Sequence, residues 1–378
     1  MVNIPNNNSV FTQNSWALLS QYIRPVFAAL VIASSLLACG NNKPADAVGS
    51  EAPVPGSKES LAAVAMNAEN VSGISRLRKS ENAIEGRYLI TLDELNSEES
   101  IEVAAVRLTK RYGGTPDLYF RRVMVGFAAW MTEEQAERMA ADSEVVQVEQ
   151  DRLVVAASVG EPIELTAAPE IAWSSDRSNQ ATRPLDGSAQ SEYQAYGVNV
   201  YVMSSGIDPK HPELKGRIGR GFSAGSGSVW LGRVMGQPQP GMLGTLLGKE
   251  AEPMATEETG DCNGHGTRMA SLIGGKTYGL ANHATLRPLR VLGCNGEGSM
   301  SGVLLAIEWL AAHFQRPSVL YMPFAPDQSM ALDKAIRQLS DRDILIVAAA
   351  GNTDPEAGNE RSADACNFSP GRVGPVIT

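Results

Sequence analysis

The run of residues from Asp343 to Ala350 constrains the fold of this chain most. After the aspartate it reads Ile-Leu-Ile-Val-Ala-Ala-Ala, without a polar side chain at alternate positions. Such a run is typical of a strand that is covered on both faces inside a parallel sheet. Before it, from residue 199 on, strand-like and helix-like spacings of apolar residues alternate. The pattern therefore predicts βαβ units and a doubly wound α/β sheet.

The same spacing predicts the other elements of this domain. Apolar residues at helical intervals give a helix over 299–314 one buried face, formed by Met300, Val303, Ile307, Leu310 and Phe314. The further predictions are strands at 199–203, 285–292 and 319–322 and a helix at 331–339. Residues 225–260 instead are rich in Gly, Pro and Met and lack periodicity. We expect a loop insertion there.

A smaller unit, residues 86–155, precedes this domain and shows the order βαββαβ. Its predicted strands are 87–92, 117–122, 125–130 and 145–149. Ser97 is the expected N-cap of the first helix, and Thr132 with Gln135 forms a capping box for the second. The buried face of the first helix comprises Ile101, Ala104, Ala105, Leu108 and Tyr112. The order predicts an α+β domain of the ferredoxin-like type, a fold that hosts many functions.

An apolar segment near the N-terminus predicts export. Residues 26–33 lead into Leu-Leu-Ala-Cys, which ends at Cys39 and resembles a bacterial lipobox. The segment is too short to span a bilayer comfortably. We interpret 1–38 as a lipoprotein signal peptide, with Cys39 lipidated and anchored in the outer membrane or at the cell surface or periplasm. A plain signal peptide cut near Ala38 is the alternative. Residues 39–85 have too few large apolar side chains to build a core and predict a flexible tether.

Five segments of the chain follow one another in an order that resembles a known family. They are 173–177, 201–207 with 211–214, 261–267, 291–299 and 349–352. The third reads Asp-Cys-Asn-Gly-His-Gly-Thr. Together they resemble subtilisin-like serine proteases (peptidase S8) of the proteinase K and aqualysin branch. The resemblance implies a subtilisin-like domain over 160–378. The 86–155 unit resembles the inhibitor I9-type propeptide of that family, which assists folding and then blocks the active cleft.

The resemblance assigns catalytic roles to residues that are only partly present. His265 matches the histidine that takes the proton of a serine nucleophile, and Asn352 matches the oxyanion donor. Ser204 lies where the family has its aspartate, and a hydroxyl cannot replace that charge. Asp208 follows past a glycine, and we expect it to point elsewhere. We find no nucleophile segment of the Gly-Thr-Ser-Met-Ala type before Thr378. The resemblance therefore implies a domain that is degenerate and C-terminally incomplete.

Peptide binding in this family adds the substrate as a strand between two enzyme edges. Gly296, Glu297 and Gly298 match one edge, where glycine allows a peptide backbone to approach closely. A simple surface turn would fit the same residues. At the other edge the family has a Ser-Leu-Gly-Gly-like run, whereas residues 323–326 read Pro-Phe-Ala-Pro. Since proline cannot donate a ladder hydrogen bond, we expect this edge to be impaired.

The resemblance also implies a disulfide between Cys262 and Cys294, which an exported protein can form. Cys366 matches a family cysteine whose partner would follow residue 378. With Cys39 lipidated, one thiol would then be left over. No cofactor is certain. Calcium is common in the family, but Asp176 and Gln180 supply only one carboxylate at a matching position, which does not make a site.

The leading interpretation is an exported, lipid-anchored subtilisin-family homologue without peptidase activity. Its partner would be a polypeptide substrate or another protein. A net charge of −10 without a basic stripe argues against nucleic acid. One alternative is a fragment of a genuine secreted endopeptidase. Another is a peptide- or protease-binding module in which residues 86–155 inhibit another protease. Because the family's late helix and strands are missing, we also expect uncovered apolar sheet faces and poor stability.

Overall fold

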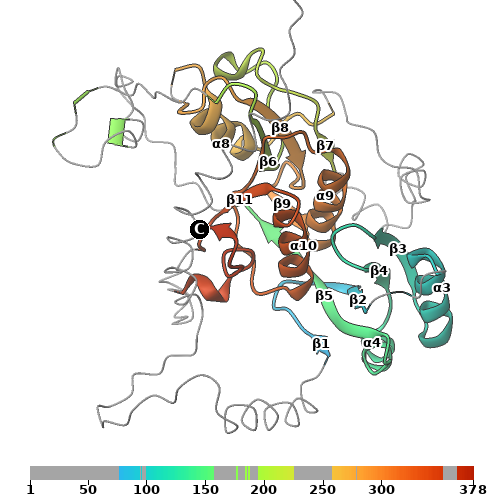
Figure 1. Cartoon of the computed structure of the whole chain (residues 1–378). Helices are drawn as coiled ribbons and strands as arrows, with labels where there is room; N and C mark the ends of the chain where they lie inside the picture. Colours follow the sequence, from blue (N-terminus) through green and yellow to red (C-terminus); the bar gives the residue numbers. More distant parts are fainter. Residues whose placement is uncertain are drawn as a thin grey trace, which may run out of the picture. The chain divides into compact units, whose positions relative to one another are not determined.

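The described residues form two folded parts, an N-terminal α+β unit and a C-terminal α/β domain (Figure 1). The computed structural model of the 378-residue chain describes residues 76–93, 95, 99–156, 176–177, 184, 186–187, 195–224, 258–277, 279–351 and 364–378. The predicted signal peptide, the lipidation at Cys39 and most of the predicted loop insertion lie outside these ranges.

The N-terminal unit is built on one sheet with the strand order β1-β5-β2-β4-β3. Its elements are β1 (Leu77–Arg78), β2 (Ala83–Leu92), α3 (Ile101–Tyr112), β3 (Thr115–Phe120), β4 (Gly126–Trp130), α4 (Glu133–Ala140) and β5 (Val145–Val155). β2 runs antiparallel to β4 and β5, whereas β1 runs parallel to β5. The predicted βαββαβ order is confirmed, with one more strand, β1, in the segment where we expected tether.

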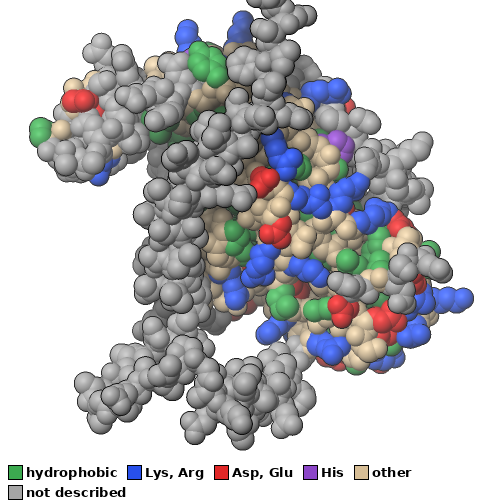
Figure 2. All heavy atoms as spheres, viewed as in Figure 1, with side chains coloured by type: hydrophobic (Ala, Val, Ile, Leu, Met, Phe, Trp, Pro, Cys, Tyr) green, Lys and Arg blue, Asp and Glu red, His purple; other side chains and the backbone are tan. Residues whose placement is uncertain are grey.

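Both helices of this unit begin at side-chain caps. Ser100, not the expected Ser97, is the N-cap of α3, because it directly precedes the first helical residue and its hydroxyl accepts the N–H of Val103. The capping box of Thr132 and Gln135 is confirmed at α4. The core between helices and sheet includes Tyr88, Ile90, Leu108, Phe127 and Met139. Outside it, basic and acidic side chains are interspersed over this part of the surface (Figure 2).

The C-terminal domain contains a six-stranded parallel sheet with the order β12-β11-β10-β6-β8-β7. Its elements are β6 (Asn199–Ser204), η2 (Pro212–Leu214), β7 (Phe222–Ser223), α8 (His265–Gly274), β8 (Thr285–Arg290), β9 (Glu297–Ser299), α9 (Met300–His313), β10 (Ser318–Met322), α10 (Met330–Ser340), β11 (Ile344–Ala348), η4 (Ala365–Asn367) and β12 (Val376–Ile377). The predicted strands and helices of this domain are therefore confirmed, with ends shifted by a few residues.

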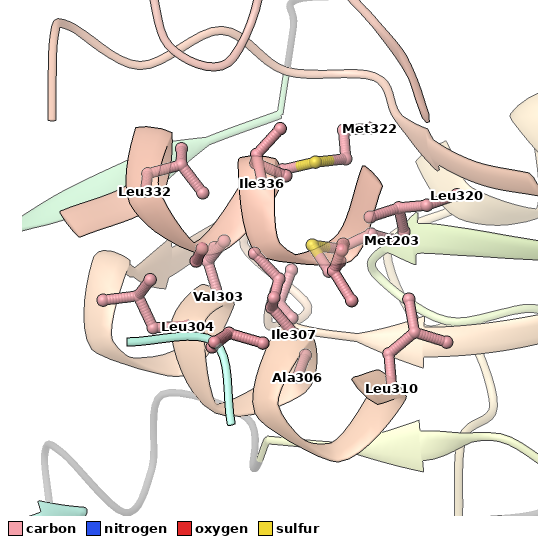
Figure 3. Close-up of a cluster of buried hydrophobic side chains, with 14 of the residues drawn as sticks. Met203, Val303, Leu304, Ala306, Ile307, Leu310, Leu320, Met322, Leu332 and Ile336 are labelled. Carbon is pink, nitrogen blue, oxygen red and sulfur yellow. The ribbon is translucent and has the colours of Figure 1, made fainter. Parts of the chain in front are cut away.

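Helices α9 and α10 cover one face of this sheet. Val303, Ile307 and Leu310 of α9, with Leu332 and Ile336 of α10, pack on side chains of β6 and β10 (Figure 3). Along α10, apolar and polar residues alternate at helical spacing, so one face of this helix is buried. On the opposite face, α8 packs on β6 and β8. The sheet therefore has helices on both faces, as in a doubly wound fold.

Within the described part of the chain, strand β11 is buried on one face and only partly covered on the other. Ile344, Ile346 and Ala348 are buried, but Leu345 is 48% exposed. Ile377 of β12, which lies opposite Val347, is 52% exposed. The expected cover on both faces is therefore wrong for this strand, because α8, the described helix on that side, packs on strands further along the sheet. The expectation of an uncovered apolar face is confirmed here. The poor stability inferred from it stays a prediction.

Candidate functional site

The end of the N-terminal unit lies along the predicted peptide-binding edge. β5 pairs antiparallel with β9, which places Leu153 opposite Ser299, Val154 opposite Gly298 and Val155 opposite Glu297. The pairing continues one residue further, where the N–H of Ala156 donates to the carbonyl of Gly296 at 2.9 Å. The predicted edge residues are therefore brought together, and the chain's own strand occupies them. A peptide in the same place would form the same backbone bonds.

Glycine is required at Gly298 by the close approach of another segment. A Cβ built there would lie 2.1 Å from the carbonyl oxygen of Val291. Gly296 has a φ of +80°, a conformation that side chains with a Cβ rarely adopt. The other predicted edge, 323–326, has no strand structure, and the carbonyl of Pro326 accepts the N–H of Ser369. The expected impairment of that edge agrees with this geometry.

Two carboxylates of β5 cap the N-termini of two helices of the C-terminal domain. Glu149 accepts the N–H of Ala331 in the first turn of α10 at 2.9 Å, and Asp151 accepts the N–H of Ser301 in the first turn of α9 at 3.1 Å. Both carboxylates are buried. Negative charge at a helix N-terminus is favourable, because the free N–H groups and the helix dipole point there. β5 therefore contacts the C-terminal domain through two side chains as well as through its backbone pairing with β9.

Glu308 of α9 makes the reciprocal contact with the turn between β3 and β4. Its carboxylate accepts the backbone N–H groups of Arg121 at 3.0 Å, Arg122 at 2.9 Å and Val123 at 3.3 Å. Glu308 is 6% exposed, so its charge is compensated by these donors and by the guanidinium of Arg122 at 3.6 Å. Successive N–H groups form a concave anion site. The sequence reasoning missed Glu308, since it reads as one polar position on a helix face.

His265 is the first residue of α8, and its ring contacts the end of β6. Nδ1 lies 2.8 Å from Oγ of Ser204, and the two residues are 3% and 0% exposed. Burial and the nearby charge of Arg268 lower the pKa of His265 below its ordinary value, while Asp261 acts in the opposite direction. The imidazole is therefore neutral at pH 7. The bond between Ser204 and His265 is therefore one between neutral groups.

Asp261 organises the loop that leads to this histidine. Its carboxylate accepts the hydroxyls of Ser205 and Thr267 and the backbone N–H groups of Asn263, Gly264 and Thr267. Burial raises the pKa of Asp261, but these donors outweigh it and the net pKa is lowered. Asp261 was not among the predicted site residues. Its position before the N-terminus of a helix is the signal that could have identified it.

Comparison with known proteins places the chain in a family. The subtilase family profile (Peptidase_S8) matches residues 195–372, and the peptidase inhibitor I9 profile matches residues 87–157. An extracellular serine proteinase of Thermus sp. (strain Rt41A) is 31% identical over 347 residues, covering 91% of this chain and 72% of that protein. This chain belongs to the subtilase family. The expected resemblance is confirmed, and so is the subtilisin-like α/β fold preceded by a propeptide-type domain.

Two other similar proteins are longer than this subtilase. Alkaline serine exoprotease A of Vibrio alginolyticus is 30% identical over 306 residues, and the chain covers 50% of its length. Among solved structures, fervidolysin from Fervidobacterium pennivorans, a keratinolytic enzyme related to subtilisin, matches with a TM-score of 0.50. It is 14% identical, and the match covers 79% of this chain and 44% of that one. This likeness supports the fold alone.

The subtilase contains the expected disulfide between Cys262 and Cys294. Cys366 is disulfide-bonded as well, and no described cysteine is free. The expected leftover thiol at Cys366 is therefore wrong. Asp208 caps its own turn, where its carboxylate accepts the N–H of Lys210.

Two residues with predicted roles, in the oxyanion hole and in a calcium site, are not among the described residues. Asn352 and Gln180 lie outside the described residues. Asp176, the matching carboxylate, accepts the N–H of Gly187. Within the described ranges, no group of three or more His, Cys, Asp or Glu side chains could hold a metal ion. Calcium binding, which the sequence left open, stays untested.

We expect Gly266→Ala to lower the free energy of unfolding by about 1–3 kcal/mol. A Cβ at this position, the second residue of α8, would lie 2.0 Å from the carbonyl oxygen of Gly206. One of the two backbone segments must then move. Urea unfolding of the whole chain measures the loss. Gly374→Ala is the control, since nothing lies within 4 Å of its added Cβ. Equal stability of the two variants would contradict the expectation.

Proposed function

We propose that this chain is an exported subtilase homologue without peptidase activity, in which the I9-type unit occupies the peptide-binding edge. The observation that carries the proposal is the 2.8 Å contact between Ser204 and His265 Nδ1. In subtilisin, removal of the triad aspartate alone lowers kcat by about 3 × 10⁴. A serine hydroxyl supplies no charge to stabilise an imidazolium. A serine at position 204 is therefore enough by itself to reduce turnover to a very low value, whatever follows Thr378.

Casein hydrolysis by the purified chain tests this proposal. We expect no hydrolysis above that of the His265→Ala variant, because the histidine has no carboxylate partner. Hydrolysis by the natural chain that disappears in His265→Ala would overturn the proposal and establish the alternative, a genuine endopeptidase. The names of two relatives, an extracellular serine proteinase and an alkaline serine exoprotease, favour that alternative.

A second candidate function is inhibition of another subtilase by the N-terminal unit. The backbone pairing of β5 with β9 and the capping carboxylates Glu149 and Asp151 favour it, since any subtilase domain with the same edge and helix ends would accept them. Residues 76–156 added to an active homologous protease should inhibit it, and the Glu149→Ala/Asp151→Ala double variant should inhibit far less. No inhibition at micromolar concentration would exclude this role.

We infer that the chain is exported and anchored through a lipid on Cys39. Support comes from the lipobox-like sequence and from a relative named as extracellular. Among the described residues, no helix is long and apolar enough to cross a membrane. Cys39→Ser should release the protein from membranes of an expressing bacterium into the aqueous fraction. Cys39 is the one cysteine of the sequence besides Cys262, Cys294 and Cys366. A lipidated sulfur cannot form a disulfide, so the mass of the peptide that carries Cys39 decides between a lipid and a disulfide at this residue. Unchanged membrane association of Cys39→Ser would contradict the anchor.

A further inference from the structure

The Cys262–Cys294 disulfide lies at the surface beside both halves of the site. Both cysteines are exposed. Cys262 precedes His265 by three residues, and Cys294 precedes Gly296 on the peptide-binding edge by two. The bond therefore ties the histidine loop to that edge. Besides the disulfide, one hydrogen bond links the two loops, from the side chain of Asn263 to the carbonyl of Cys294 at 3.0 Å.

A guanidinium contacts this disulfide. Nη2 of Arg290, the last residue of β8, lies 3.2 Å from Sγ of Cys262 and 3.9 Å from Sγ of Cys294. Nη1 donates to the carbonyl of Gly260 at 2.9 Å, which fixes the side chain in place. Among the described carboxylates, none forms an ion pair with Arg290. Its positive charge is thus directed at sulfur.

We propose that Cys262–Cys294 is a thiol-exchange site that accepts two electrons from a dithiol, with Arg290 stabilising the leaving thiolate. An adjacent cation stabilises a thiolate, and a more stable leaving thiolate departs faster. Because Arg290 is closer to Cys262, the dithiol attacks Sγ of Cys294 and Cys262 leaves. The exchange site therefore lies on the loops that flank the peptide edge.

The exchange balances in two steps. First, one thiolate of the dithiol forms a bond to Sγ of Cys294 while the Cys262–Cys294 bond breaks, and its electron pair stays on Cys262. Second, the other thiol of the dithiol loses its proton to solvent and attacks its own mixed disulfide. Cys294 then leaves as a thiolate and takes up a proton. The dithiol ends as a cyclic disulfide, oxidised by two electrons, and the protein ends with two reduced cysteines.

Dithiothreitol applied to the full chain, followed by rapid alkylation and peptide mass analysis, tests the proposal. Early samples should carry label on Cys262 and dithiothreitol on Cys294. Arg290→Met should slow reduction of this bond roughly three- to tenfold, whereas Arg290→Lys should keep most of the rate. Arg287→Met is the matched control, since Arg287 lies on the same strand but donates to Asn199, Gln315 and a backbone carbonyl instead of sulfur.

A measurement on the natural chain guards against misfolding of the variants. The position of the early label is such a measurement, because it requires no substitution, and it should lie on Cys262. Equal rates for Arg290→Met and Arg287→Met would overturn the proposal. So would early labelling of Cys294 in place of Cys262 in the natural chain.

Discussion

Asp151→Ala is expected to lower the free energy of unfolding by about 3 kcal/mol, the lower end of the loss seen when one partner of a buried ion pair is removed. Asp151 is fully buried, and Nε of Arg87 donates to it at 2.9 Å. The variant leaves Arg87 buried with Asp117 as its remaining carboxylate, and it leaves the N–H of Ser301 without its acceptor. Urea unfolding at pH 7 measures the loss.

The matched control for this prediction is Glu133→Ala. Glu133 pairs with Lys79 on the surface of the same unit, and both side chains are largely exposed. Exposed pairs contribute little, because water solvates both charges well. We therefore expect no measurable change for Glu133→Ala. If Asp151→Ala were no less stable than this control, the ion pair and the helix cap would not hold β5 as described.

Local patterns predicted most of the secondary structure, because apolar spacing records which face of an element is buried. Helix α9 and strand β6 were predicted from this signal, and both are present. The end of β5 was predicted wrongly, since the strand was expected to stop at Glu149 but runs to Val155. Its last residues are held by pairing with β9, about 140 residues later in the chain, and no local pattern records such a partner.

The site shows the same division between local and distant signals. His265 and the disulfide were predicted, because both lie in segments whose sequence resembles the family. The helix caps of Glu149 and Asp151 and the role of Glu308 were missed. Each joins residues that are about 150 to 190 positions apart, and a single carboxylate on a strand or helix usually indicates a solvated face. Only burial distinguishes these three carboxylates from solvated ones, and burial cannot be read from the sequence at a single position.

Ser204→Asp is expected to raise the pKa of His265 from below to above its ordinary value of 6.5. Burial now disfavours the charged imidazole, and the neutral Ser204 hydroxyl 2.8 Å from Nδ1 offers no compensating charge. A carboxylate in the same place would pair with the imidazolium. Proton NMR titration of the ring follows the change, with His265→Asn to assign the signal. Ser204→Asn is the control, because it has a similar shape without the charge and should leave the titration low.

The same substitution should reverse how stability depends on pH. In the natural chain the folded pKa of His265 is lowered, so the unfolded state binds protons more readily and stability falls as pH decreases from 6.5 towards the folded value. In Ser204→Asp the folded pKa is raised, so the added stability is present below 6.5 and is lost as pH rises through the new value. Each unit of difference corresponds to about 1.4 kcal/mol. Urea unfolding between pH 5 and pH 8 measures both slopes, and equal slopes in Ser204→Asp and Ser204→Asn would show that Ser204 does not occupy the position of the charge partner.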